Sequence, residues 1–391
     1  MTRVYIGCFG SGLGHAARML EVADRIRGEG GEVRFSSSGE VTSMIEGRGY
    51  ACNDLPLADV RYDNGGFSFR ETMSASPRIF ARAVLQTRLE SAFIRDYRPH
   101  AVLTDSALPT LMAARMAGLP SFSVLNQLSL SSSAGPKGVL PSLFSAGMTA
   151  GMGKLWNLSD EVFLPDLPPP FTISEGSLWG NRLTKTKYVG FMHSRPLPTA
   201  GPREGAFGHD HRTRIFWQVS GPPGTRGAFL EKALQTARDL SETAVTVVTG
   251  GDPSAATAPV EIPGGWLYGW CRSPWQFFDD CDVVVSRAGH GTVSQAILAS
   301  KPSLLVPIPR QPEQDGNARK AERLGVARTM RQEELTTTTV AKLISVLRGE
   351  PYVSGARKLG SYAARFRAVE NVAHTVMDAG RGRQAPDARR P

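Results

Sequence analysis

A short apolar run followed by a glycine-rich turn constrains the fold of this 391-residue chain more than any other feature. The run, residues Asp282 to Ser286 (DVVVS), has the length and composition of a strand buried in a parallel sheet. Gly289 and Gly291 follow it, and the residues after them predict a helix that begins at Thr292. A strand, a glycine turn and a helix in this order indicate an α/β fold with a parallel sheet.

The same turn is a candidate phosphate site, because the first N–H groups of a helix lack partners within it and lie at the positive end of its dipole. A second apolar run, Ser303 to Ile308, leads to the polar residues Glu313, Gln314 and Asn317. Ligands of open α/β sheets bind beyond the carboxyl ends of the strands. One loop therefore suits a diphosphate and the next suits hydroxyl groups, which predicts a nucleotide-sugar site.

These residues resemble the donor-binding region of GT-B glycosyltransferases, in particular family 28, the MurG-like group. The phosphate loop of that family, roughly R-S-G-x-x-T-V-S-E, is similar to residues 287–295 (RAGHGTVSQ). The (D/E)-Q-x-x-N-A motif of related sugar transferases matches residues 313–318 (EQDGNA). Residues 164–174 (LPDLPPPFTIS) resemble archaeal members but point to no chemistry. The resemblance implies two Rossmann-like parallel-sheet domains that face a cleft. It also implies that Glu313 and Gln314 hold the sugar hydroxyls of the donor.

Gln295 stands where the family has a glutamate that holds the ribose diol. An amide has one acceptor and one donor group, so it would hold the ribose more weakly or suit a different nucleotide. A second interpretation is structural, because Thr292 and Gln295 have the spacing of a helix capping box. The sequence leaves both interpretations open.

The first half of the chain repeats the strand, turn and helix. Val4 to Phe9 predicts a strand and Ala16 to Arg27 a helix, with Ala16, Met19, Leu20, Ala23 and Ile26 at helical spacing. The turn between them reads G-x-G-x-G, which misses the dinucleotide fingerprint by one position, so binding of NAD or ATP is poorly supported. Gly12 and Gly14 instead permit a close approach of backbone to ligand beside His15.

His15 has a candidate partner in Asp105, which follows a predicted strand at Ala101 to Thr104 and precedes a predicted helix at Pro109 to Ala117. The motifs G-x-G-H-x-x-R (residues 12–18) and R-P-x-x-x-x-T-D (residues 98–105) extend the resemblance to this half. It implies that His15 is the base for the acceptor hydroxyl and that Asp105 holds it, a task that suits imidazole. The alternative is that His15 stabilises its loop and Asp105 is an ordinary acid at a helix N-terminus.

The length of the chain exceeds one ordinary core, so two domains are expected. We expect an acceptor-binding domain at residues 1–195, a Pro/Gly-rich linker at 196–212 and a nucleotide-sugar-binding domain at 213–353. A helix at 354–379 should return to the first domain, and 380–391 should be a disordered tail.

In the second domain Ser220 and Gly221 form another glycine turn, and Trp270 either stacks on the base or lies in the core. The donor-binding candidates are Gly12, Gly14, Ser220, Gly221, Trp270, Arg287, Gly289, His290, Gly291, Thr292, Gln295, Glu313, Gln314 and Asn317.

Composition limits the possible partners. No apolar run reaches the ~20 residues of a spanning helix, and no leader precedes Val4, so we expect a cytoplasmic protein. The four cysteines do not have the spacing of a metal site, so we expect them to be reduced thiols. The net charge of +9 suits a polyanionic partner such as a phosphate-bearing lipid or an anionic membrane surface. The segment from Lys137 to Lys154, apolar between its lysines, could be interfacial or part of the core. No nucleic-acid motif is present, so we expect no nucleic-acid partner.

These features predict an inverting glycosyltransferase that moves a hexose-type sugar from a nucleotide sugar, UDP-linked, to a hydroxyl acceptor that could be lipid-linked. No cofactor and no metal are expected, because no D-x-D motif stands where a metal would hold the donor diphosphate. The catalytic candidates are His15 and Asp105. A nucleotide-sugar hydrolase or epimerase is one alternative, and a non-catalytic protein that binds sugar nucleotides or lipids is another.

Overall fold

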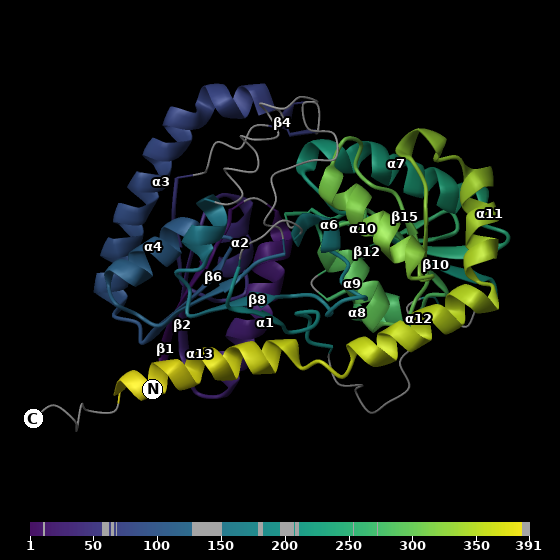
Figure 1. The fold of residues 1–391 in the computed structure, drawn as a ribbon. Helices are drawn as coiled ribbons and strands as arrows, with labels where there is room; N and C mark the ends of the chain where they lie inside the picture. Colours follow the sequence, from purple (N-terminus) through teal and green to yellow (C-terminus); the bar gives the residue numbers. More distant parts are fainter. Residues whose placement is uncertain are drawn as a thin grey trace, which may run out of the picture.

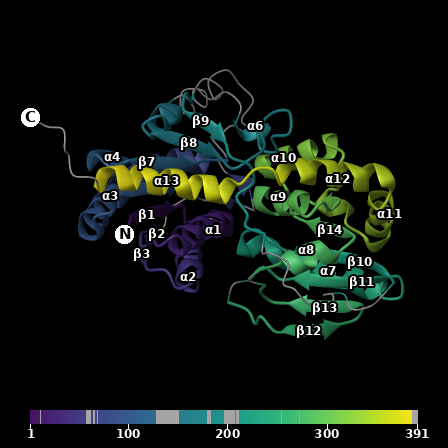
Figure 2. The same cartoon turned by 90° about the horizontal axis from the view of Figure 1, so that it is seen from below.

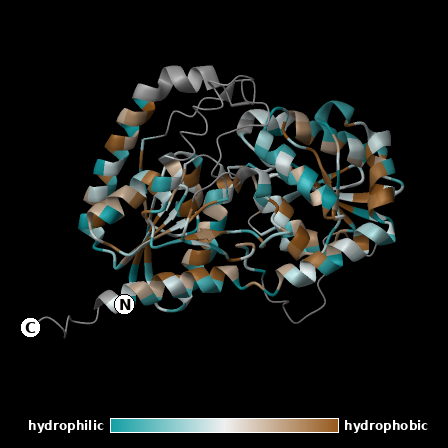
Figure 3. Ribbon diagram, viewed as in Figure 1, coloured by the Kyte–Doolittle hydropathy of each residue, from teal (hydrophilic) through white to brown (hydrophobic). Residues whose placement is uncertain are grey.

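The computed structural model describes residues 1–10, 12–56, 62–63, 66–67, 69–126, 151–178, 183–195, 207, 211–252, 254–271 and 273–384. These residues form two lobes, each built around a seven-stranded sheet with helices packed around it (Figure 1). Many strand residues are hydrophobic (Figure 3), and the buried apolar residues of the helices pack with them in the core clusters. Among the described residues, no helix combines the length and the apolar character needed to cross a membrane. The predicted architecture of two parallel-sheet units is confirmed.

The first lobe holds a parallel sheet with the strand order β3-β2-β1-β6-β7-β8-β9. Strand β1 (Arg3–Cys8) pairs with β2 and β6, and α1 (Leu13–Gly28) follows it. The five apolar residues that are spaced for one face of α1 are all buried, as predicted. The other elements are β2 (Glu32–Ser37), α2 (Glu40–Glu46), β3 (Cys52–Asp54), β4 (Tyr62–Asp63), β5 (Gly66–Phe67), α3 (Phe69–Tyr97), β6 (Ala101–Asp105), α4 (Leu108–Met116), β7 (Ser121–Val124), β8 (Glu161–Leu164), α6 (Glu175–Leu178) and β9 (Thr186–Tyr188).

The second lobe has the strand order β12-β13-β11-β10-β14-β15-β16, parallel except where β12 pairs with β13. Valine-rich β11 and β14 are buried over their whole length, as expected for strands covered on both faces. The elements are β10 (Thr213–Gln218), α7 (Pro223–Asp239), β11 (Ala244–Thr249), β12 (Pro259–Ile262), β13 (Gly265–Tyr268), α8 (Trp275–Asp280), β14 (Val283–Ser286), α9 (His290–Leu298), β15 (Ser303–Leu305), α10 (Pro312–Arg323), β16 (Ala327–Thr329), the 3₁₀ helix η1 (Gln332–Glu334), α11 (Thr337–Leu347) and α12 (Glu350–Ala363).

The strand registers bring the loops that follow the strands to one edge of each sheet. In the first sheet Cys8 pairs with Asp105, so β1 and β6 end at the same level. In the second sheet Ser286 pairs with both Gln218 and Leu305, so β10, β14 and β15 also end together. The loops that follow these strands therefore start side by side within each sheet.

A hydrophobic cluster joins the two lobes. Leu167, Ile173 and Phe191 follow strands of the first sheet but pack with Ala288 and Val293 of the second lobe. Nearby, α6 packs against α10, where the Glu175 carboxylate lies 2.6 Å from the Lys320 ammonium group. Residues 166–178 of the first lobe thus contact the helices that follow β14 and β15.

The C-terminal segment differs from the single helix predicted at residues 354–379. It forms two helices, α12 in the second lobe and α13 (Ala368–Gln384), which packs against α1, β1 and β6 of the first lobe (Figure 2). The helical conformation is interrupted between α12 and α13, where Phe366 packs against Gly190 and the ring of Tyr362. Residues 380–384, predicted as part of a disordered tail, are helical, because Gly380 lies close against Thr2 and His100. The rest of the tail and nearly all of the predicted linker lie outside the described residues.

Gly190 tests this packing. It has a φ of +88°, and a Cβ there would lie 2.2 Å from the Cβ of Phe366. We expect Gly190→Ala to lower the free energy of unfolding by about 2 to 4 kcal/mol, because the strained backbone and the overlap act together. The matched Gly382→Ala variant in α13, where the added Cβ has open space, should be neutral or slightly stabilising. Equal unfolding midpoints for the two variants would contradict this account.

Candidate active site

His15 and Asp105 form a hydrogen-bonded pair at the carboxyl edge of the first sheet. His15 lies in the first turn of α1, and its Nδ1 is 2.8 Å from Oδ1 of Asp105, the last residue of β6. The carboxylate is fully buried, whereas 21% of the His15 side chain is exposed. The interpretation of Asp105 as a helix N-terminal acid is wrong, because Ala107 is the N-cap of α4. The pair presents an imidazole to solvent with a buried acid behind it.

Two residues that could not be assigned a role from the sequence complete this cluster. Arg18 donates from Nε to Oδ2 of Asp105 and from Nη2 to Oδ1 at 2.5 Å. Its Nη2 also donates to Oδ1 of Asn126, beyond the end of β7, at 3.1 Å. Arg18 belongs to the G-x-G-H-x-x-R motif, which was a usable signal, whereas no motif marks Asn126. All four side chains gather where β1, β6 and β7 end.

The charges of the cluster oppose one another. Burial raises the pKa of Asp105, but Arg18 and His15 outweigh burial and lower the pKa to about 2. Burial lowers the pKa of Arg18, but Asp105 raises it more, and Glu313 of the second lobe adds a smaller contribution of the same sign. Asp105 is therefore ionised at neutral pH, and Glu313 lies within electrostatic range of the first lobe.

The predicted phosphate turn lies at the start of α9, but the predicted helix start at Thr292 is wrong. The helix begins at His290, with Gly289 as its N-cap in extended conformation and no side-chain cap. The capping-box interpretation of Gln295 is therefore wrong as well, because Thr292 already lies in the first turn. Because the helix begins at His290, the backbone N–H groups of His290, Gly291 and Thr292 have no carbonyl group within the helix, four residues earlier, to which they could donate. They form the candidate anion site.

Arg287 occupies a different place from the one predicted for it. Only 1% of the residue is exposed, its guanidinium lies over the Phe229 ring, and Nη2 donates to the Thr225 carbonyl oxygen and to Oε1 of Gln332. Burial lowers the pKa of Arg287 to about 10. The arginine thus holds the start of α7 against the second sheet, and a direct bond from its side chain to a donor diphosphate does not fit this arrangement.

The sugar motif divides into two parts. Gln314 is buried and its Oε1 accepts from the backbone N–H of Ile308, while buried Asn317 donates to the carbonyl oxygen of Ala288. These two amides bind the loops after β15 and β14 to α10. Glu313, in the first turn of α10, is half-buried, and its carboxylate is the member of the motif that acts on Arg18 across the lobes.

The remaining donor candidates lie at the same edge. Gly221 precedes α7 with a φ of +112°, which favours glycine, and Ser220 beside it is half-buried. Trp270, beyond β13, is also half-buried and belongs to none of the hydrophobic clusters found among the described residues, so the interpretation of a core tryptophan is not supported. Gln295 is half-buried on α9. In the first lobe, Gly12 is the N-cap of α1 and Gly14 lies in its first turn.

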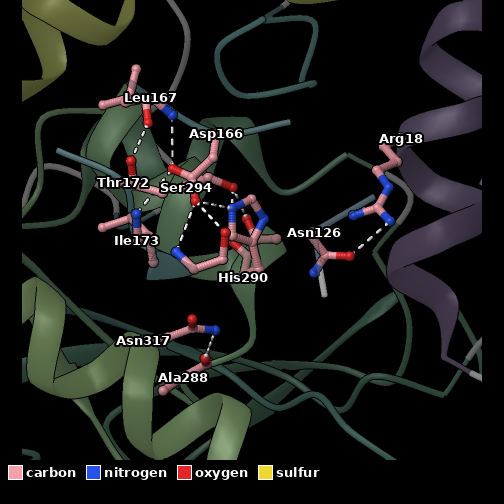
Figure 4. A network of polar contacts seen from close by, with 12 residues as sticks. Arg18, Asn126, Asp166, Leu167, Thr172, Ile173, Ala288, His290, Ser294 and Asn317 are labelled. Atoms are coloured by element: carbon pink, nitrogen blue, oxygen red, sulfur yellow. Dashed lines mark hydrogen bonds and ion pairs between the residues drawn. The ribbon is translucent and has the colours of Figure 1, made fainter. Parts of the chain in front are cut away.

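A buried carboxylate connects the phosphate turn to the first lobe (Figure 4). Asp166 accepts hydrogen bonds from the backbone N–H groups of Leu167, Ile173 and Ser174, from the Ser174 hydroxyl, and from Nε2 of His290 at 3.2 Å. Burial raises its pKa, but His290 and Ser174 outweigh burial and lower it. Nε2 of His290 is thus engaged with Asp166, while its backbone N–H lies at the start of α9. Asp166 lies within the 164–174 motif, to which no chemistry could be assigned from the sequence.

A second histidine contacts α9 from the segment that leaves the first sheet. Nε2 of His193 lies 2.9 Å from Oγ of Ser294. Burial lowers the pKa of His193 to about 3, and the charges of His290 and Arg18 act in the same direction. His193 is therefore neutral in the folded protein at neutral and mildly acidic pH.

The low pKa of His193 predicts a pH dependence of stability. Below its ordinary pKa of about 6.5 the unfolded chain binds a proton that the folded chain does not, so stability is lost as pH falls from 6.5 towards 3. Between pH 7.5 and 5.5 this contribution should be roughly 1 kcal/mol. His193→Gln should lose that much less stability over this interval than the wild type, measured by urea unfolding. His211→Gln, at an exposed position, is the control, and identical pH dependence in all three proteins would refute the account.

Among the described residues, no group of three or more His, Cys, Asp or Glu side chains is arranged to hold a metal ion. The polar groups that converge are instead backbone N–H groups at α9, the Glu313 carboxylate, and the cluster of His15, Asp105 and Arg18. These groups place a helix N-terminus, a carboxylate and a partly exposed imidazole on facing lobes.

Comparison with known proteins agrees with this arrangement. Residues 275–368 match the glycosyltransferase family 28 C-terminal domain. An "uncharacterized glycosyltransferase" of Methanosarcina acetivorans is 23% identical over 90% of this chain and 89% of its own length. The UDP-N-acetylglucosamine–N-acetylmuramyl-(pentapeptide) pyrophosphoryl-undecaprenol N-acetylglucosamine transferase of Acidithiobacillus ferrooxidans is 26% identical over 96% of each chain.

Solved structures share the fold over nearly the whole chain. The glycosyltransferase of kitacinnamycin has a TM-score of 0.69 at 16% identity, covering 96% of this chain and 98% of its own. MurG of Acinetobacter baumannii has a TM-score of 0.60 at 16% identity, covering 97% and 100%. The matched domain and the named relatives support glycosyltransferase activity, and the fold over nearly the whole chain is the one that MurG and the other solved glycosyltransferases share.

Proposed function

We propose that the protein is an inverting transferase that moves a hexose-type sugar from a nucleotide sugar to a hydroxyl acceptor. The observation that carries this proposal is the His15–Asp105 pair, at 2.8 Å, on the lobe opposite the α9 turn and Glu313. His15 is partly exposed and Asp105 is buried and ionised, which is the arrangement of a base supported by a carboxylate.

In this proposal Nε2 of His15 takes the proton of the acceptor hydroxyl as its oxygen attacks the anomeric carbon. The bond from that carbon to the diphosphate breaks on the opposite face, so the configuration of the sugar inverts. Negative charge then develops on the leaving nucleoside diphosphate. The backbone N–H groups of Gly291 and Thr292, with the α9 dipole, stabilise that charge.

We further propose that the donor is UDP-linked and that Glu313 binds its sugar. The name of the Acidithiobacillus relative gives UDP-N-acetylglucosamine as its donor. The structure of a spinosyn rhamnosyltransferase, which has a similar fold, contains thymidine diphosphate. Gln295 would contact the ribose and Trp270 would stack on the base. Thermal-shift screening against UDP-, dTDP- and GDP-sugars tests the nucleotide, because a ligand that binds the folded state raises its stability.

We propose a lipid-linked acceptor at the cytoplasmic membrane surface. The net charge of +9 and the acceptor named for the Acidithiobacillus relative, an undecaprenol pyrophosphate, support it. The apolar stretch from Lys137 to Lys154 falls largely outside the described residues, so the support it gives comes from its sequence. The protein should float with anionic vesicles at low salt and be released by salt, because salt screens surface charge. Failure to bind such vesicles, with efficient use of a water-soluble acceptor, would overturn this part.

The base assignment predicts the effect of removing His15. His15→Ala should lower turnover by about two to four orders of magnitude, the usual contribution of a general base, and leave donor affinity nearly unchanged. His374→Ala, which removes an exposed histidine on α13, is the matched control. Turnover near that of the wild type in folded His15→Ala would sink the assignment. Release of free sugar from the donor without an acceptor would favour a hydrolase.

The sugar assignment predicts a selective loss of binding. Glu313→Ala should weaken binding of the sugar nucleotide by roughly 10- to 100-fold, the loss of a hydrogen bond to a charged group, and bare UDP much less. Glu333→Ala, at an exposed acid of the same lobe, serves as the control. If calorimetry shows equal weakening for UDP and the UDP-sugar, Glu313 contacts the nucleotide instead.

A further inference from the structure

The hydrogen atoms around His15 can be assigned from the contacts of Arg18. Nη2 of Arg18 carries two hydrogens but approaches three atoms: Oδ1 of Asp105 at 2.5 Å, Oδ1 of Asn126 at 3.1 Å and Nδ1 of His15 at 3.0 Å. A guanidinium only donates. Two hydrogens can make two well-directed hydrogen bonds, so the third atom either shares a hydrogen or is not an acceptor.

The Asp105 carboxylate identifies which one. Nδ1 of His15 lies 2.8 Å from Oδ1 of Asp105, and the carboxylate is ionised, so the hydrogen between them belongs to Nδ1. Nδ1 then has no lone pair for Arg18. The two hydrogens of Nη2 go to Asp105 and Asn126, and the contact between Nη2 and Nδ1 is an approach of two donors.

The Nε2–H tautomer competes with this arrangement, because Asp105 would still accept both hydrogen bonds from Arg18 if Nδ1 of His15 no longer donated to it. The second Nη2 hydrogen would then point to Nδ1, and the proton of His15 would sit on Nε2. Oδ1 of Asn126 prevents this by accepting that hydrogen. Asn126 is buried, and the Phe9 ring packs edge-on against His15 with ring centroids 5.8 Å apart, which restrains the imidazole plane.

We propose that Asn126 is a positioning residue that selects the Nδ1–H tautomer of His15, because its Oδ1 accepts the Nη2 hydrogen of Arg18 that would otherwise point to Nδ1. This leaves the lone pair on Nε2, the nitrogen that accepts a proton from the acceptor hydroxyl. The inference rests on the proposed role of His15 as base, but the tautomer itself is a property of the protein without substrate. Charged groups that act on the site are Asp105 from β6, Arg18 from α1 and, through Arg18, Glu313 from α10.

The test combines the ring state of His15 with kinetics. Long-range ¹H–¹⁵N spectra of histidine-labelled protein in alkaline buffer report which ring nitrogen carries the hydrogen, and the His15 signals are those lost in His15→Gln. The wild type should show Nδ1–H. Asn126→Leu, which removes the acceptor without creating a charge, should shift His15 towards Nε2–H. Its kcat should fall by about 10- to 100-fold, less than the loss expected when the base itself is removed, at unchanged donor KM.

Asn126→Asp restores an acceptor oxygen at the same place and should recover the Nδ1–H tautomer and most of the lost kcat. The wild-type spectrum tests the proposal without any variant, because an Nε2–H tautomer there overturns it. The proposal therefore stays testable even if Asn126→Leu misfolds. A folded Asn126→Leu with the wild-type tautomer and kcat also overturns it. If His15→Ala proves fully active, the proposed function fails, whereas the spectra still decide how the tautomer is selected.

Discussion

The Asp166 carboxylate is the contact on which the relation between the two lobes depends. It is fully buried, and it orders the loop after β8 through three backbone N–H groups and a serine hydroxyl, while its remaining hydrogen bond goes to His290 at the start of α9. A buried charge with this many donors is stable only while all of them stay in place. The start of α9 in the second lobe is therefore positioned by a residue of the first.

This coupling explains how two separate sheets can build one site. The loop ordered by Asp166 places Leu167 and Ile173 in the hydrophobic cluster of the second lobe, and His193 adds a contact to α9. At the carboxyl edge of the first sheet, the positive charge of Arg18 offsets the buried negative charge of Asp105. The charge of Glu313, which lies at the carboxyl edge of the second sheet, raises the pKa of Arg18. The positive end of α9 is left as a place for an anion.

Much of this could be predicted because parallel strands end at a common edge. Once β1 and β6 are recognised, His15 and Asp105 must lie near each other, and the turns after β10, β14 and β15 must converge. The start of α9 was misplaced because two glycines before Thr292 do not look helical in sequence. Arg287 is a donor-binding candidate in the sequence, since nothing there shows that Phe229 and Gln332 contact its guanidinium. Asp166 and Asn126 lie in loops without periodicity, where only the fold reveals their partners.

A crystal structure with a bound nucleotide sugar tests the central claim most directly. The account predicts that the diphosphate lies within hydrogen-bond distance of the backbone N–H groups of Gly291 and Thr292. The anomeric carbon should then face Nε2 of His15, with room between them for an acceptor oxygen. A nucleotide bound instead at the Gly12–Gly14 turn of the first lobe, or a sugar turned away from His15, would contradict it.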